Sequence, residues 1–302
     1  DRLPLAPSQA PPAQGREEKP EAILGYGQGL EPAILEFCAR AWPNRDQRTL
    51  ESRWRWMYLD SAARLEREPL MWNYCEADTV IGYTGAVPVR VKLDGDVRDT
   101  AWLVDTMILE SCRDRGLGPL IMMQAREDVP FSLSLGQTEE MRSILYRLGW
   151  QQVGPLQTYV YPLRPGRMLK GKLNPLLAGP AGAGLQMRQY ARQMTVQTQK
   201  YDLETRRIRR FDERHDRLWE AVKQDYPCAA VRDASYLNWK YVDQPGQDYV
   251  RLEMLQNGRP AAVAVLLLRE PGEPSAYRYR RAMIVDLVAP AGDKAFLFSV
   301  LE

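Results

Sequence analysis

The stretch Arg113-Asp114-Arg115-Gly116-Leu117-Gly118 is the most informative part of the chain, because it joins a strand-like run, Leu103 to Leu109, to a helix-like run that begins at Leu117. Glycine has no Cβ, so the backbone at Gly116 and Gly118 can adopt unusual dihedral angles and approach a ligand closely. The first amides of the following helix lack intrahelical partners, and the helix dipole favours an anion there. The stretch therefore predicts a loop whose backbone amides bind a phosphate group.

Two glycines at this spacing are also typical of an ordinary turn. The flanking segments therefore have to distinguish a phosphate-binding loop from such a turn. Alternation of apolar and polar residues predicts strands over 72–76, 80–93, 97–109 and 131–135. Helical spacing of apolar residues predicts helices over 31–42, 47–59 and 141–148, and one that follows the loop. The predicted order is a strand, two helices, three antiparallel strands, a helix, a strand, a helix and further strands.

Residues 22–163, here called the first lobe, resemble the GNAT acyltransferases in two motifs. One is the strand Val104-Asp105-Thr106-Met107-Ile108 with the loop Arg113 to Gly118. The other is Ile144-Leu145-Tyr146-Arg147-Leu148-Gly149-Trp150, which is similar to the family's signature of a tyrosine, a basic residue, Leu-Gly and an aromatic residue. The resemblance implies an α+β fold with a mixed, mostly antiparallel sheet flanked by helices. It also implies an enzyme that transfers an acetyl or other acyl group from coenzyme A to an amine.

The resemblance implies a role for each motif. In such proteins the loop amides, here those of Arg113, Asp114, Arg115, Gly116, Leu117 and Gly118, hold the pyrophosphate of coenzyme A. Met107 and Ile108 on the preceding strand are expected to lie along the pantetheine arm. Tyr146 is expected near the thioester sulfur, where a phenol, protonated at neutral pH, can protonate the departing thiolate. The alternative for Tyr146 is a half-buried aromatic residue on an amphipathic helix.

The general base has several candidates among the acidic residues. An amine must be neutral to attack, so a carboxylate or a chain of water molecules has to take its proton. Asp105 and Glu110 flank the cofactor strand and are the catalytic candidates beside Tyr146; Glu51 and Glu76 lie on elements that could border the cleft. Each of these carboxylates has the simpler alternative of a solvated surface residue. The family commonly has an Asn before the last helix, where this sequence has Glu139.

Other chemistries find less support in the sequence. His215 is the only histidine, and its charged neighbours predict a solvated residue on a helix without a catalytic triad. The cysteines are widely spaced with no Cys-x-x-Cys, so no metal site is predicted and reduced thiols are expected. They are Cys38, Cys75, Cys112 and Cys228.

The composition agrees with a soluble, cytoplasmic enzyme. The chain has 302 residues, 45% hydrophobic and 26% charged, with a net charge of +2, which is ordinary for globular domains. Its longest apolar run, 261–268, is too short to span a bilayer, and no signal peptide is visible. Residues 1–21 are rich in proline and predict a disordered linker. Because the chain begins at Asp1, we expect it to be a piece of a longer polypeptide.

An internal repeat predicts a second lobe, residues 206–302. The run Trp54 to Asp60 recurs as Leu237 to Asp243, with Trp56 matching Trp239 and Tyr58 matching Tyr241. Each copy is followed by a Val-Asp pair on a predicted strand, Val104-Asp105 and Val285-Asp286. The chain therefore resembles a tandem GNAT protein.

The second lobe is expected to be degenerate. In the register of the repeat, Leu297 and Ser299 stand where the first lobe has Gly116 and Gly118. A leucine there would block close approach of the backbone to a ligand, so only the first lobe is expected to bind the cofactor. The chain also ends inside the helix that should follow the loop, which predicts an incomplete lobe.

The connector between the lobes, residues 164–205, is basic. From Arg164 to Arg210 there are eleven Lys or Arg against only Asp202 and Glu204. Glycines at 179–184 predict a flexible break, and residues 185–199 a helix. A basic helix suits an acidic carrier protein or an anionic membrane surface, and the simpler alternative is a solvated connector. Nucleic acid is the least favoured partner, because no recognised binding motif accompanies the charge.

Three functions remain open. The first is an N-acyltransferase that uses acetyl-CoA or another acyl-CoA and acts on a small-molecule or carrier-bound acceptor. The second keeps the fold but takes the acyl group from the phosphopantetheine of an acyl carrier protein. The third is a binding or scaffold module that no longer catalyses.

Overall fold

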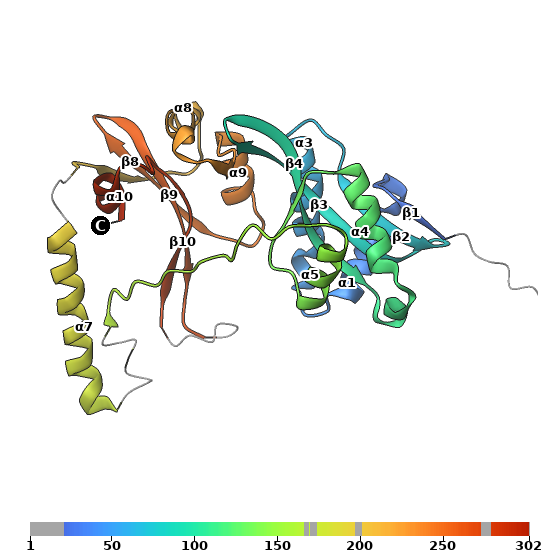
Figure 1. Cartoon of the computed structure of the whole chain (residues 1–302), viewed down its shortest axis with the longest axis horizontal. Helices are drawn as coiled ribbons and strands as arrows, with labels where there is room; N and C mark the ends of the chain where they lie inside the picture. The colour runs from blue at the N-terminus through green and yellow to red at the C-terminus, as the bar shows by residue number, and fades with distance from the viewer. Residues whose placement is uncertain (1–20, 166–168, 170–173, 197–200, 273–278, 302) are drawn as a thin grey trace, which may run out of the picture.

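The computed structural model contains two lobes, each built around its own sheet, as Figure 1 shows. It describes residues 21–165, 169, 174–196, 201–272 and 279–301. The predicted linker 1–21 lies outside these residues except for Glu21, as do several basic residues of the connector, namely Arg167, Lys170, Lys172 and Lys200. The predicted α+β class is confirmed.

The first-lobe sheet has the predicted strands in a mostly antiparallel arrangement. In spatial order they are β1 (Glu21–Leu24), β2 (Leu70–Glu76), β3 (Thr79–Leu93), β4 (Asp96–Ile108) and β5 (Ser132–Ser134). Every neighbouring pair is antiparallel except β4 and β5, which are parallel. β3 is buried continuously from Val80 to Val89, as expected for a central strand with both faces covered.

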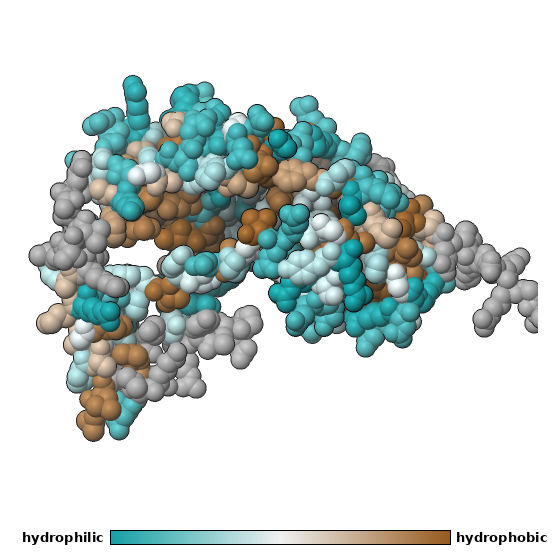
Figure 2. Space-filling view, viewed as in Figure 1, coloured by the Kyte–Doolittle hydropathy of each residue, from teal (hydrophilic) through white to brown (hydrophobic). Residues whose placement is uncertain are grey.

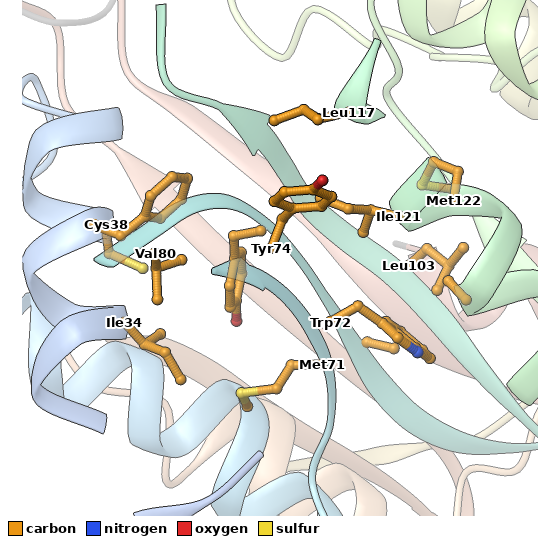
Figure 3. Packing of buried hydrophobic residues seen from close by; sticks show 14 of the residues in the cluster. Ile34, Cys38, Met71, Trp72, Tyr74, Val80, Leu103, Leu117, Ile121 and Met122 are labelled. Carbon is orange, nitrogen blue, oxygen red and sulfur yellow. The ribbon is translucent and has the colours of Figure 1, made fainter. Parts of the chain in front are cut away.

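Helices cover both faces of this sheet. They are α1 (Glu31–Ala41), α2 (Leu50–Trp54), a π-helical turn η3 (Arg55–Asp60), α3 (Ser61–Ala63), α4 (Leu117–Asp128) and α5 (Glu139–Arg147), with short 3-10 turns η1 (Gln28–Leu30), η2 (Gln47–Thr49) and η4 (Glu110–Arg115). Neighbouring residues of β3 point to opposite faces. The Tyr83 ring packs on Phe37 of α1, while the Thr84 hydroxyl lies 3.8 Å from Met122 Sδ of α4. Figure 3 shows residues of both helices meeting around the strands.

The prediction of further strands after α5 is wrong. Residues 150–162 form neither helix nor strand, and Figure 1 shows them running as coil towards the second lobe. Their apolar side chains are exposed, Val153 and Tyr159 among them. Pro155 and Pro162 bracket the β-prone part of this stretch, and proline cannot donate a ladder hydrogen bond.

The second-lobe sheet is antiparallel, in the order β10-β9-β8-β6. Its strands are β6 (Glu204–Arg207), β8 (Tyr249–Gln256), β9 (Arg259–Arg269) and β10 (Arg281–Val288). One face packs on α8 (Glu213–Val222) and α9 (Ala234–Tyr241), and η5 (Lys223–Asp225) continues α8. The other face meets α10 (Lys294–Leu301) at one end, and Figure 2 shows hydrophobic surface remaining over β9 and β10.

The repeated runs form the boundary between the lobes. The Trp56 and Trp239 rings stack at 5.1 Å with an interplanar angle of 15°. Each indole N–H donates to the backbone carbonyl of the other tryptophan, at 2.7 Å and 2.9 Å. The short strand β7 (Cys228–Ala230) also pairs with the Val91–Leu93 end of β3, so the second lobe adds a strand to the first-lobe sheet.

The connector contains one long helix where a break was predicted. α7 (Pro175–Val196) continues through residues 179–184, so the predicted break is wrong, and the predicted helix beyond it is confirmed as far as Val196. Alanine, leucine and glutamine around these glycines favour helix, which outweighs the backbone hydrogen bond lost at Pro180. Figure 1 shows α7 standing apart from both sheets. Among the described helices, none is long and apolar enough to cross a bilayer.

The prediction of a solvated His215 is also wrong. Its side chain is 1% exposed, and Nδ1 accepts the backbone N–H of Asp212 in a capping box at the start of α8. Nε2 faces the buried Glu253 carboxylate at 3.5 Å. His215 lies in helical register with Leu218, Trp219 and Val222, the buried face of α8, and this spacing outweighs its charged sequence neighbours.

Candidate functional site

The predicted phosphate loop forms η4 and the start of α4. Gly116 has φ of +70°, a left-handed conformation that other residues adopt only with strain, and it directly precedes α4. Among the described residues, no side chain accepts a hydrogen bond from the first amides of α4, those of Leu117, Gly118 and Leu120, while Pro119 has no N–H. A Cβ added to Gly118 would have only Ile108 Cγ1 in contact, at 3.9 Å. The first turn of α4 thus presents uncapped amides on an open surface.

The two loop arginines differ in their partners. Arg115 Nη1 lies 3.5 Å from Glu76 Oε1. Arg113 is exposed, and in the described part of the chain its guanidinium contacts Met107 Sδ, at 3.8 Å, and no carboxylate. Asp114 beside it is exposed as well. Arg113 is therefore the loop cation best placed to meet an added anion.

The strand before the loop has an unpaired edge. β4 pairs with β5 only between Ala101–Leu103 and Ser132–Ser134. Beyond Leu103, the described structure gives this edge of β4 no further partner. Met107 and Ile108 are half-buried on this part of the strand, immediately before η4. An extended ligand that reaches the loop can therefore lie along β4 as a substitute for a neighbouring strand.

Asp105 occupies a bulge at the point where β4 leaves β5. Val104 pairs with Gly85 and Met107 with Tyr83, so β4 carries one extra residue here, and Asp105 has φ of +55°. Arg45 Nη2 and Nη1 donate to its two carboxylate oxygens at 2.6 Å and 3.0 Å. This ion pair is partly buried, with the Asp105 side chain 16% exposed.

Tyr58 completes the cluster around Asp105. Its hydroxyl donates to Asp105 Oδ2 at 3.2 Å. Burial, and then the neighbouring Tyr83 and Asp105, raise the pKa of Tyr58, so it remains a protonated donor. Its ring fills the space beside Gly85, where an added Cβ would lie 2.3 Å from Tyr58 Cε1. Only glycine fits at this position of β3.

The other predicted catalytic residues lie apart from this cluster. Tyr146 on α5 is 48% exposed, and its hydroxyl donates to the Gln152 side chain. Among the described residues, no hydrogen bond joins Tyr146 to Asp105, to Glu110 or to the loop. Glu110 is exposed at the start of η4 and makes no ion pair with any described residue.

The four candidate bases differ in whether they form an ion pair. Glu51 accepts a hydrogen bond from Arg55 at 3.0 Å. Glu76 pairs with Arg115 and Asp105 with Arg45. In the described structure Glu110 alone of the four is without a cationic partner.

The second lobe contains a matching cluster. Asp286 on β10 accepts from Arg232 Nε at 2.8 Å and from the Tyr241 hydroxyl at 2.7 Å. Tyr58 and Tyr241 match in the sequence repeat, as do Asp105 and Asp286. The repeat therefore contained a signal for these contacts, because both members of each Tyr–Asp pair recur. Arg45 and Arg232 lie outside the matched runs, and sequence reasoning missed them.

The second-lobe loop differs from the predicted correspondence. Leu297 and Ser299 lie inside α10 rather than before it, because only residues 289–293 separate β10 from α10, whereas residues 109–116 separate β4 from α4. Asp293 caps α10 by accepting the Phe296 N–H at 2.9 Å. Tyr201 donates to the same carboxylate, and these bonds lower the pKa of Asp293. An ionised side chain thus occupies the helix end that is open in α4.

A cavity of about 320 Å³ lies at the lobe boundary, away from the loop. Its charged groups already have partners: Arg90 pairs with Asp233, and Lys223 with Glu220. The buried Lys92 ammonium donates to the Tyr226 carbonyl at 2.9 Å. This cavity therefore offers less to an anionic ligand than the α4 terminus does.

Solved structures with a similar architecture include two GCN5-related N-acetyltransferases and a probable N-acyltransferase. No protein-family model matches the sequence, and no curated protein matches it. A GCN5-related N-acetyltransferase from Anabaena variabilis ATCC 29413 matches with a TM-score of 0.61 at 10% identity. A conserved protein from Enterococcus faecalis V583 matches at 0.58 and 8%, and a GCN5-related N-acetyltransferase from Kribbella flavida at 0.52 and 13%. Each match covers 93% of this chain, hence both lobes, and 61% of the other chain.

Proposed function

We propose that this chain, which has the GNAT fold, is an N-acyltransferase whose first lobe binds an acyl-coenzyme A and transfers the acyl group to an amine. The observation that carries the proposal is the open N-terminus of α4. Gly116 turns the chain into the helix in a left-handed conformation, and within the described residues no side chain caps the first amides and Arg113, on the preceding turn, has no carboxylate partner. A pyrophosphate suits this combination of donors and charge.

The strand geometry extends the site from the pyrophosphate to the reacting group. With the pyrophosphate on residues 113–118, the pantetheine arm runs back along Met107 and Ile108 at the unpaired edge of β4. This direction brings the thioester towards the bulge at Asp105, where β4 and β5 separate. The acceptor amine then attacks the thioester carbonyl carbon, the C–S bond breaks and coenzyme A leaves as a thiolate.

Proton transfers in this scheme have proposed donors and acceptors. Tyr146 is proposed to protonate the thiolate, which requires α5 to bring its exposed hydroxyl from Gln152 to the sulfur. Glu110 is the proposed base, since it alone of the four candidate carboxylates lacks an ion pair in the described structure. The Asp105 oxygens accept three hydrogen bonds, which suits a positioning role better than proton transfer.

Calorimetric titration with coenzyme A tests the binding site, and two glycines provide a matched pair of variants. Gly116 and Gly246 have φ of +70° and +71°, and a Cβ on either meets nothing within 4 Å. Gly116→Ala and Gly246→Ala should each lose roughly 1 kcal/mol of stability through backbone strain. Only Gly116→Ala should weaken coenzyme A binding, by at least about tenfold, since the strain displaces the loop amides.

Two further measurements distinguish this proposal from a carrier-protein donor and from a scaffold function. Thiol release from acetyl-CoA in the presence of a panel of primary amines would establish acyl transfer. Binding of a phosphopantetheinylated carrier protein, without binding of free coenzyme A, would favour the carrier-bound donor. If neither thioester binds at the first lobe, the enzyme proposal fails and a scaffold function remains.

A further inference from the structure

We propose that Arg45 is a positioning residue that fixes the β4 bulge, and with it the strand edge that receives the acyl thioester. Arg45 acts through Asp105 and is not assigned a contact with the reacting atoms. The inference rests on the proposed function of the first lobe, but the conformation of the bulge can be measured without any reaction.

The first observation is the backbone of Asp105. A non-glycine residue with φ of +55° inside a strand is strained, and such residues persist only where the surroundings hold them. Three hydrogen bonds to the Asp105 carboxylate supply that restraint, two from Arg45 and one from Tyr58. The guanidinium is itself held at 4.1 Å from the centre of the Trp42 ring.

The second observation is where the bulge lies. Its other face carries Thr106, whose hydroxyl is 3.1 Å from the Thr84 hydroxyl and 3.8 Å from Met122 Sδ on α4. The bulge is therefore held between the Arg45 ion pair on one face and α4 on the other. The helix that follows the proposed pyrophosphate loop thus also packs against the bulge.

The third observation comes from the second lobe. Arg232 and Tyr241 also hydrogen-bond Asp286 at a bulge in β10, but Arg232 donates only its Nε–H to one oxygen, whereas Arg45 donates from both Nη atoms; Asp286 is not among the described residues with positive φ. Of these two aspartates, the one with the left-handed backbone is the one whose two oxygens are both held by an arginine. At the bulges, that conformation occurs in the lobe whose helix begins without a side-chain cap and not in the lobe whose helix end is capped by Asp293.

Amide hydrogen exchange of two matched variants, Arg45→Gln and Arg232→Gln, tests the proposal. Peptides covering 101–109 and 110–120 are followed with and without saturating coenzyme A. In the wild type and in Arg232→Gln, coenzyme A should protect both peptides. In Arg45→Gln it should still protect 110–120, while 101–109 exchanges at least roughly tenfold faster with or without ligand, as expected from losing hydrogen bonds to a charged group.

The outcomes separate a positioning role from a merely structural one. Equal protection of 101–109 in the two variants would overturn the proposal, as would loss of loop protection in parallel with loss of bulge protection. If Arg45→Gln does not fold, Arg45→Lys keeps the charge but not the two-pronged geometry, and the same difference between peptides is expected.

Failure of the proposed function has a different signature. If coenzyme A protects neither peptide in the wild type, the first lobe does not bind it and the enzyme proposal fails. The comparison of Arg45→Gln with Arg232→Gln without ligand then decides whether Arg45 holds the bulge. Where thiol release from acetyl-CoA is measurable, Arg45→Gln should lower kcat at least roughly tenfold with little change in coenzyme A affinity, and Arg232→Gln should leave both unchanged.

Discussion

The helices that follow β4 and β10 begin differently in the two lobes. α4 begins at Gly116 with no side-chain cap, whereas α10 begins after Asp293, which caps it with a carboxylate. The sequence suggested that a bulky leucine had closed the second site. The structure instead shows a loop shorter by three residues, from eight (109–116) to five (289–293), and an acidic cap that occupies the amides.

What the lobes share lies at their boundary and around their bulged strands. Trp56 and Trp239 come from the repeated runs, and their contacts are reciprocal across the boundary. The Tyr58–Asp105 and Tyr241–Asp286 hydrogen bonds are likewise repeated. The shared contacts are thus those that join helix to strand and lobe to lobe. We infer that the lobes differ in function mainly through their loops.

The largest expected effect is the loss of stability when either tryptophan of the lobe boundary is replaced. Trp56→Ala and Trp239→Ala should each reduce the free energy of unfolding by about 3–5 kcal/mol, because each removes a buried ring and leaves a buried carbonyl without its donor. Urea unfolding of both single variants and the double variant gives the coupling energy. Additive losses would show that the two rings do not stabilise each other and would contradict a symmetric lobe boundary.

A transplanted cap should have the next largest effect. Gly116→Asp places at α4 the kind of residue that precedes α10, and we expect coenzyme A affinity to fall at least about 100-fold, because the carboxylate competes for the amides and repels the pyrophosphate. Asp tolerates the left-handed region better than most residues, so the helix should remain folded. Calorimetry measures the affinity, with Gly246→Asp as the control at a glycine that has nearly the same φ but precedes no helix. Unchanged binding in Gly116→Asp would remove the pyrophosphate from this helix end.

Much of the first lobe follows from local patterns in the sequence. β2, β3 and β4 alternate or run apolar, and α1, α4 and α5 repeat at helical spacing, so their positions were predicted to within a few residues. Contacts between distant residues leave no such pattern. Arg45 is one of many loop arginines, and nothing local shows that it meets a carboxylate 60 residues away.

The wrong predictions have a common physical basis, which is that tertiary context overrides local character. Residues 150–162 have β-prone side chains, but no sheet edge pairs with them in the described structure. His215 has charged neighbours, but its helical position faces the core. The second-lobe loop could not be aligned from the repeat alone, because a deletion between β10 and α10 shifts every later residue.

A moderate effect on turnover is expected when the hydroxyl of Tyr146, the proposed acid, is removed. Tyr146→Phe removes the hydroxyl that now donates to Gln152 and keeps the ring, so coenzyme A affinity should change little. If Tyr146 protonates the thiolate, kcat for thiol release from acetyl-CoA should fall by about 100-fold. Gln152→Ala is the companion variant, since it frees the hydroxyl without removing it, and it should not lower kcat. Equal losses of affinity and turnover in Tyr146→Phe would argue against the acid role.

The smallest expected effect concerns the second-lobe cap and depends on pH. Hydrogen bonds from Tyr201 and from the Phe296 N–H lower the pKa of Asp293 in the folded state. A group with a lowered folded pKa contributes stability above its unfolded value, near 4, and this contribution is lost as the pH falls through the folded pKa. Asp293→Asn keeps a capping side chain without the charge, so between pH 5 and pH 3 it should lose less stability than the wild type. Urea unfolding at the two pH values measures the difference. The same acid dependence in both proteins would mean that Asp293 is not held ionised at the end of α10, and would remove the electrostatic part of its contrast with the open end of α4.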